Sequence, residues 1–384
     1  MNRFYNLDFL RGAAAFLVLG GHLRAYLIVD YSQIIAQGDT VGIGSQIFYL
    51  LTGLSHEAVI IFFALSGYLV GGKAFSDTLS DRLSWPLYYA RRLSRLWIVL
   101  VPALLLTFIF DSIGIRLTDG VGYDGLFADV YPSGPGIGAD TDELTLTSFI
   151  GTLLFIQTIF TPTFGSNGPT WSLANEFWYY VTIPLIFWLC MSKSAFRPKV
   201  LGVIALILSL IIIPARFYEG ALIWTVGAFA ALSFKTHLGG RLFRIPVVQI
   251  FSTLAIPLCL VATKLSSNFN DLELGLIVAL ALPGLASFRT KIPVFSITSH
   301  AISEISYTLY LTHIPLLTLI VMIGFAPERY PISPYSLALF FTLFLVAVGW
   351  SVLVWWLFER HTNEVYGWIN NKLGKIGISK PQRI

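Results

Sequence analysis

Arg11 and His22 combine a permanent cation with a titratable imidazole inside the apolar stretch LDFLRGAAAFLVLGGHL. On an α-helix, eleven residues turn the chain through about 1,100°, so both side chains project from one face, about 16 Å apart along the axis. Histidine changes its protonation near neutral pH and can act as a general base on a hydroxyl group. The alternative is a structural histidine, hydrogen-bonded between two helices.

The segment RRLSR contains three arginines within about one and a half helical turns: Arg91, Arg92 and Arg95. Arginine forks bind phosphate groups in a bidentate manner, so this cluster and Arg11 could hold a phosphorylated cosubstrate. The alternative is that the cluster marks the cytoplasmic end of a membrane helix or contacts anionic lipid.

Glu176 is the predicted partner of His22. It lies about one turn inside the apolar segment WSLANEFWYY, at the depth that His22 should reach from its own helix. A carboxylate beside an imidazole orients the ring and stabilises its protonated form. We therefore predict that His22 and Glu176 are catalytic. Glu57, near the outer end of the second apolar segment, is the second candidate for the partner of His22.

Three further residues are predicted to line the site. Ser66 and the glycine that follows it are small enough to leave a slot for a narrow chain, although close helix packing needs the same residue types. Tyr310 and His313 are three residues apart and share one helix face. No histidine pair has the spacing of metal ligands, and no glycine-rich phosphate loop is present, so we expect no metal.

The composition places these residues in a membrane protein. The chain has 384 residues, of which 55% are hydrophobic and 12% are charged, and its mean hydropathy is +0.73. Soluble domains carry about 25% charged residues. The net charge of +4 does not indicate a nucleic-acid partner, because the basic residues cluster by membrane side. Cys190 and Cys259 both lie in apolar segments and suggest no disulfide framework.

The fold class predicted from these segments is an all-α polytopic membrane protein with about ten transmembrane helices. One more apolar segment, 147–160, is too short to span a bilayer and is predicted to be re-entrant. The ten predicted spans are 7–29, 46–72, 95–114, 171–191, 199–217, 220–236, 246–264, 271–288, 302–324 and 335–359.

Both termini are predicted to be cytoplasmic. With the N-terminus inside, all but five of the 25 Lys and Arg residues lie on the inner side, as the positive-inside rule requires. The five outer residues are Arg24, Arg116, Arg216, Lys264 and Arg329. We expect a transmembrane domain at 1–360 and a basic cytoplasmic tail at 361–384.

Five motifs, taken together, resemble the acyltransferase-3 family of bacterial membrane-bound acyltransferases. The opening segment LDFLRGAAAFLVLGGHL has the family's pattern of a basic residue, ten residues and a histidine. The later segments FFALSGYLV, RRLSR, WSLANEFWYY and ISYTLYLTHIPLL are similar to the family's other signatures, in the same order. The resemblance extends from the N-terminus to about residue 316, and it implies a ten-helix core.

The resemblance implies an acyltransferase of the bacterial inner membrane that takes acyl-CoA from the cytoplasm, with acetyl-CoA as the expected donor. The acceptor would be a hydroxyl group of a glycan or lipo-oligosaccharide. The four arginines would hold the nucleotide phosphates, the pantetheine arm would rise between helices past Ser66, Tyr310 and His313, and His22 would be the catalytic base. From the residues alone, a proton-coupled transporter or glycan exporter with His22 and Glu176 as a proton relay is the alternative.

Overall fold

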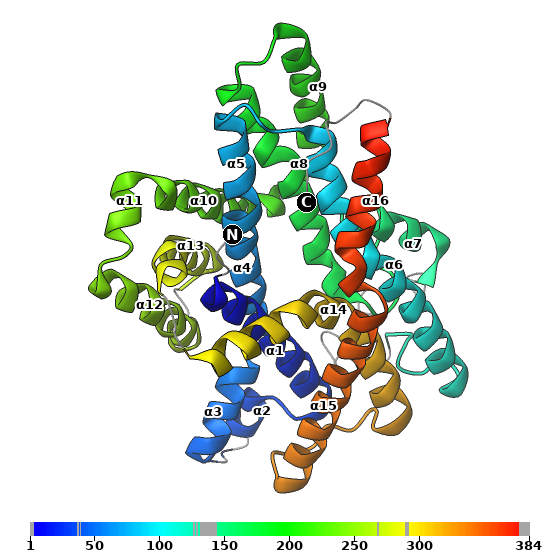
Figure 1. Cartoon of the computed structure of the whole chain (residues 1–384). Coiled ribbons are helices and arrows are strands. Elements are labelled where there is room, and N and C mark those ends of the chain that lie inside the picture. The colour runs from blue at the N-terminus through cyan, green and yellow to red at the C-terminus, as the bar shows by residue number, and fades with distance from the viewer. Residues whose placement is uncertain are drawn as a thin grey trace.

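The computed structural model is a bundle of helices (Figure 1), and it describes residues 4–36, 38, 40–125, 127, 130, 144–266, 269–288 and 292–375. Within these ranges the chain forms α-helices, joined by short 3₁₀ or π turns and loops. The α-helices are α1 Tyr5–Leu27, α2 Tyr31–Ala36, α3 Ile43–Thr52, α4 Ser55–Ser66, α5 Gly72–Leu79, α6 Trp85–Leu117, α7 Leu146–Leu153, α8 Trp171–Met191, α9 Phe196–Ile212, α10 Tyr218–Lys235, α11 His237–Leu242, α12 Pro246–Leu265, α13 Asp271–Ser287, α14 Pro293–Gly324, α15 Pro334–Leu357 and α16 Thr362–Lys375.

A helix occupies each of the ten predicted spans. Five helical stretches in the described residues are long and apolar enough to cross a membrane: Ser55–Leu79, Trp85–Leu117, Pro246–Leu265, Pro293–Gly324 and Pro334–Lys375. The protein is therefore an all-helical membrane protein. That the other five helices cross the membrane remains a prediction, as does the cytoplasmic position of the termini.

The second predicted span, 46–72, has the wrong bounds. Its first part belongs to a separate helix, α3, which ends at Thr52 with Gly53 as its C-terminal cap. The membrane-length stretch is Ser55–Leu79, made of α4, the π-helical turn Gly67–Gly71 and α5. Hydropathy alone does not separate α3 from α4, because both helices are apolar.

The segment 147–160 contains only the eight-residue helix α7, which starts at a capping box formed by Thr145 and Ser148. The chain that follows is non-helical and is tied to other helices by side chains. The backbone N–H and the hydroxyl of Ser166 donate to the Asp111 carboxylate at 2.7 and 2.8 Å, and Asn167 donates to the Leu311 carbonyl oxygen at 2.9 Å. These bonds satisfy polar groups that are buried in the bundle.

Helices α1 and α14 run side by side in the same direction. Arg11 contacts Ser303, His22 contacts His313, and Tyr26 contacts Thr318, with sequence offsets of 292, 291 and 292 residues. A constant offset is the signature of a parallel pair, since an antiparallel pair would show a constant sum. The face of α1 that carries Arg11 and His22 therefore faces α14, as the helical spacing predicts.

The Asp30 carboxylate links the loop after α1 to the loop after α14. It accepts a hydrogen bond from Arg24 at 2.7 Å and forms a salt bridge with Arg329 at 2.9 Å. Arg329 also donates to the carbonyl oxygen of Ile28 at 2.8 Å. Burial disfavours the charged carboxylate, but the two arginines outweigh it and hold the pKa of Asp30 below its ordinary value.

Helices α4 and α10 approach closely at Gly67, the first residue of the π-helical turn. A Cβ atom at this position would lie 2.0 Å from the carbonyl oxygen of Trp224. Glycine is therefore required at position 67 for the packing of α4 against α10. This is the close helix packing that the sequence offered as an alternative reason for small residues here. A π-helical turn shifts the register of the side chains that follow it, and such turns often occur at functional sites.

The predicted basic tail is in large part a helix. Residues Thr362–Lys375 form α16, which packs along α6 (Figure 1), and the rest of the tail lies outside the described residues. Its Tyr366 is 7% exposed, so this helix is attached to the bundle through its side chains.

Candidate active site

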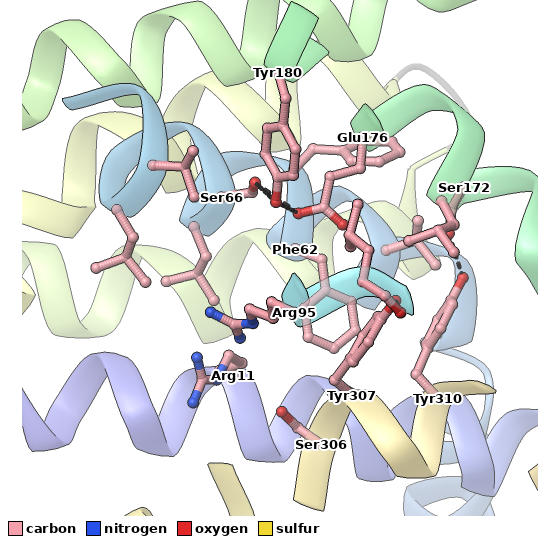
Figure 2. Close-up of a pocket in the computed structure, with 17 residues that line it drawn as sticks. Arg11, Phe62, Ser66, Arg95, Ser172, Glu176, Tyr180, Ser306, Tyr307 and Tyr310 are labelled. Atoms are coloured by element: carbon pink, nitrogen blue, oxygen red, sulfur yellow. Dashed lines mark hydrogen bonds between the residues drawn. The ribbon is translucent and has the colours of Figure 1, made fainter. Parts of the chain in front are cut away.

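A cavity with an empty volume of about 810 Å³ lies between α1, α4, α6, α8 and α14 (Figure 2). Its polar lining residues are Arg11, Ser66, Arg95, Ser172, Glu176, Tyr180, Ser306, Tyr307 and Tyr310. Four residues predicted from the sequence as cosubstrate-binding therefore line one cavity: Arg11, Arg95, Ser66 and Tyr310.

Two arginines form one end of the cavity. Figure 2 shows the guanidinium groups of Arg11 and Arg95 directed toward each other. Arg11 donates to the Ser303 carbonyl oxygen at 3.1 Å and to the Ser303 hydroxyl, but its buried Nε has no hydrogen-bond partner in the described part of the chain. Arg95 makes no hydrogen bond or salt bridge with the described residues. Two facing cations with unused donors are suited to an anion between them.

Glu176 lies on the wall of the cavity and is held by hydroxyl groups. Its Oε1 atom accepts from Ser66 at 2.7 Å and from the Tyr180 hydroxyl. The Ser66 hydroxyl also lies 3.2 Å from the indole nitrogen of Trp224. The dashed lines in Figure 2 mark part of this network, which holds the Glu176 carboxylate beside the C-terminal end of α4.

Tyr310 closes the other end of the cavity. Its hydroxyl lies 2.6 Å from that of Ser172 and 3.1 Å from the carbonyl oxygen of Pro169. Its ring packs edge-on against Phe62, with 5.7 Å between ring centroids. The position of Tyr310 is thus set by the 3₁₀ turn before α8, by the first turn of α8 and by α4 together.

His22 and His313 lie beyond Tyr310 and form a pair. The distance from Nδ1 of His22 to Nε2 of His313 is 2.9 Å, and Nδ1 of His313 lies 2.7 Å from the carbonyl oxygen of Leu309. Neither imidazole lines the cavity. His313 follows Tyr310 by three residues on α14, which is about 4.5 Å along the axis, and the two rings have centroids 6.5 Å apart.

These contacts assign the protons of both rings. A carbonyl oxygen only accepts, so Nδ1 of His313 carries a proton, and in the neutral ring Nε2 is then an acceptor. Nδ1 of His22 must therefore donate to His313, which leaves the lone pair of His22 on Nε2. His22 as a whole residue is partly exposed, whereas His313 is fully buried. The arrangement presents one oriented basic nitrogen.

Arg91 and Arg92 line a separate cavity, so the predicted arginine cluster is divided between two sites. This inner basic pocket has an empty volume of about 720 Å³ and is lined by Lys73, Asp77, Arg82, Leu83, Ser84, Leu87, Tyr88, Arg91, Arg92 and Tyr366. It adjoins the first cavity at Tyr88, whose hydroxyl donates to the carbonyl oxygen of Tyr180 at 3.1 Å.

Glu176 and Glu57, the two predicted carboxylate partners of His22, contact other residues instead. No contact among the described residues joins Glu176 to His22, and the nearest polar partner of His22 is His313. Glu57 forms a salt bridge with Lys264 at 2.6 Å. A role for Glu176 in the reaction remains a prediction, but its contacts place it with Ser66 and Tyr180.

Sequence reasoning missed Tyr180 and Glu359. Tyr180 is one turn after Glu176, and this spacing could have indicated the contact between them. Glu359 accepts from the backbone N–H and hydroxyl of Thr308, at 3.2 and 2.5 Å, and its charge attracts both Arg11 and Arg95. It is the final residue of the last predicted span, 335–359, where a charge is expected at a membrane boundary.

The fold and the site define a helical membrane protein with an internal cavity that has two arginines at one end and Tyr310 at the other, with a histidine pair behind Tyr310. The family model for the acyltransferase-3 family, described as an acyltransferase domain, matches residues 4–360, and the chain belongs to that family. The protein is therefore a membrane acyltransferase. Searches of curated proteins and of solved structures gave no match.

Proposed function

We propose that the protein transfers an acyl group, with acetyl as our first candidate, from cytoplasmic acyl-CoA to a hydroxyl of a glycan or lipo-oligosaccharide. The observation that carries this proposal is a cavity with two arginines at one end and, behind Tyr310 at the other end, a histidine pair that orients one basic nitrogen. Family membership supports the acyltransferase activity. The donor, the acceptor class and the bacterial inner membrane as location are what the family resemblance of the motifs named above implies.

The arginines fit a phosphorylated donor. Arg11 and Arg95 face each other with unused donors, and the inner basic pocket beside them adds Arg91 and Arg92. A nucleotide with a diphosphate and a further phosphate would place anionic groups at both sites. The cavity then offers a route for the narrow pantetheine arm past Ser66 toward Tyr310.

In the proposed step, Nε2 of His22 takes the proton of the acceptor hydroxyl as its oxygen attacks the thioester carbonyl. The carbon–sulfur bond breaks, the sulfur leaves as the CoA thiolate and takes up a proton, and the acyl group remains on the acceptor oxygen as an ester. The bond from His22 to His313 is compatible with both protonation states of His22, because Nδ1 is a donor in each. The base therefore accepts a proton without changing its partner.

The test is acyl transfer by purified protein from radiolabelled acetyl-CoA to a panel of oligosaccharides, with release of CoA thiol measured in parallel. We expect His22→Ala to lose about 10²- to 10⁴-fold in turnover, the usual contribution of a general base. His56→Ala is the matched control, because His56 is an exposed histidine paired with Asp271 at 2.6 Å. Equal turnover by His22→Ala and wild type would remove His22 from the mechanism.

The transporter alternative makes a different prediction for the same variants. A proton-coupled carrier in sealed vesicles would move protons with its solute and release no CoA thiol. Thiol release that depends on both His22 and an acceptor sugar contradicts the transporter.

A further inference from the structure

Helix α16 lies outside the part of the chain that the family model matches, which ends at residue 360. It nevertheless forms a wall of the inner basic pocket through Tyr366, opposite α5 and the first turns of α6. A segment beyond the matched region thus contributes a side chain to a pocket that adjoins the proposed active site.

Tyr366 contacts one of the arginines directly. The guanidinium carbon of Arg91 lies 4.7 Å from the centroid of the Tyr366 ring, within the range of a cation–π interaction. Arg91 is otherwise exposed, and no hydrogen bond from its side chain to the described residues fixes its position. The tyrosine ring is the contact that holds this guanidinium at the pocket.

The charges of the pocket favour an anion. Lys73, Arg82, Arg91 and Arg92 are opposed by one carboxylate, Asp77, which pairs with Lys73 at 2.7 Å. The buried Nε of Arg92 has no hydrogen-bond partner among the described residues. Arg82, Arg91 and Arg92 also have no carboxylate partner in that part of the chain, and three such guanidiniums are suited to one or two phosphate groups.

We propose that α16 completes the nucleotide subsite of the donor, with Tyr366 positioning Arg91 against a phosphate of the adenosine end of acyl-CoA. This inference rests on the proposed function for the identity of the donor. It assigns Tyr366 as a positioning residue that decides how strongly the enzyme prefers a donor with a nucleotide over one without.

The test compares kcat/KM for acetyl-CoA and for S-acetyl-pantetheine, which carries the same thioester without the nucleotide. Loss of a cation–π contact corresponds to between about threefold and thirtyfold in affinity. Tyr366→Leu, which keeps apolar packing, should lower kcat/KM for acetyl-CoA by that factor and leave S-acetyl-pantetheine unchanged. Tyr366→Phe keeps the ring and should behave as wild type.

Trp368→Leu is the control on the same helix, because Trp368 is 59% exposed and contacts Lys372 outside the pocket. An equal loss with both donors in Tyr366→Leu would show a structural role and overturn the inference. Unchanged kinetics with both donors would overturn it as well.

A binding measurement separates this inference from the proposed function. Adenosine 3′,5′-bisphosphate is titrated calorimetrically into wild type and Tyr366→Leu in an uncharged detergent. Binding that weakens in the variant supports the subsite even if no acyl transfer is found. A pocket that binds phosphatidylglycerol micelles but not the nucleotide would be a lipid-phosphate site, and the inference would be wrong.

Discussion

The histidine pair gives the sharpest prediction, because the two ring nitrogens of His313 have different roles. Nε2 accepts the proton of His22, and Nδ1 donates to the Leu309 carbonyl oxygen. Glutamine places its amide oxygen near the position of Nε2, whereas the shorter asparagine side chain reaches only to the position of Nδ1. His313→Gln therefore keeps the acceptor for His22, and His313→Asn removes it.

The magnitude follows from the group left without a partner. A buried donor without an acceptor costs about 1–3 kcal/mol, and each 1.4 kcal/mol corresponds to about tenfold in rate. In His313→Asn, Nδ1–H of His22 loses its partner, and the tautomer with the proton on Nε2, which cannot act as a base, becomes populated. We expect kcat to fall by roughly 10- to 100-fold, with donor KM nearly unchanged. His313→Gln should retain about ten times the rate of His313→Asn.

The assay is steady-state CoA thiol release with saturating acceptor, with thermal melting of each variant as a check on folding. The comparison between two amides separates orientation of His22 from packing, since both variants remove the imidazole ring of His313 and both are polar. If His313→Asn were as active as His313→Gln, or if both matched wild type, the proposed orientation of His22 by His313 would be refuted.

Three further predictions concern other parts of the structure. Glu176→Gln keeps the hydrogen bonds to its hydroxyl partners but removes the charge, so turnover should fall about 10- to 100-fold while calorimetric CoA affinity changes little; a loss of affinity alone would contradict this. Gly67→Ala places a methyl group against the Trp224 carbonyl and should destabilise the protein by about 1–3 kcal/mol or more, seen as a lower melting temperature, whereas Gly349→Ala has open space around its Cβ and should not. The pKa of Asp30 is lowered, so its contribution to stability is present above the ordinary pKa of 3.8 and is lost as pH falls through the lower folded-state pKa. The melting temperature of Asp30→Asn should therefore be lower than that of wild type at neutral pH, and the difference should shrink in acid.

The sequence predicted features that depend on one helix at a time. The common face of Arg11 and His22 follows from eleven residues at 3.6 per turn, and both contact α14 in the structure. The bounds of α8 match the predicted span 171–191 because its ends are marked by polar residues. Local periodicity and composition contain this information.

The sequence could not predict which helices are neighbours. The sequence predicts that Glu176 and His22 lie at the same depth in the membrane, but equal depth does not imply contact. The rotation and the lateral position of α8 are set by packing against other helices. The nearest polar partner of His22 is instead His313, from a helix nearly 300 residues away in sequence. Glu57 likewise contacts Lys264, which hydropathy assigns only to the end of another helix.

The division of the arginine cluster has the same origin. Arg91 and Arg95 are four residues apart and share a helix face within about 40°, yet they line different cavities. The side chains of α16 and α8 that surround them decide this, and neither helix is close in sequence to RRLSR.

The parallel contact between α1 and α14 has a consequence for the length of the donor. Arg11 and His22 are each fastened to α14, so the spacing of about 16 Å between them is a property of a rigid helix rather than of a loop. Inserting or deleting one residue between them would rotate His22 by about 100° away from His313, whereas adding eleven would nearly restore its direction but displace it by another 16 Å. Under the proposed function, we therefore expect the bundle to select donors by the distance between the phosphate and the reacting carbonyl: a compact donor such as acetyl phosphate would be too short to occupy Arg11 and present its carbonyl to His22 at the same time.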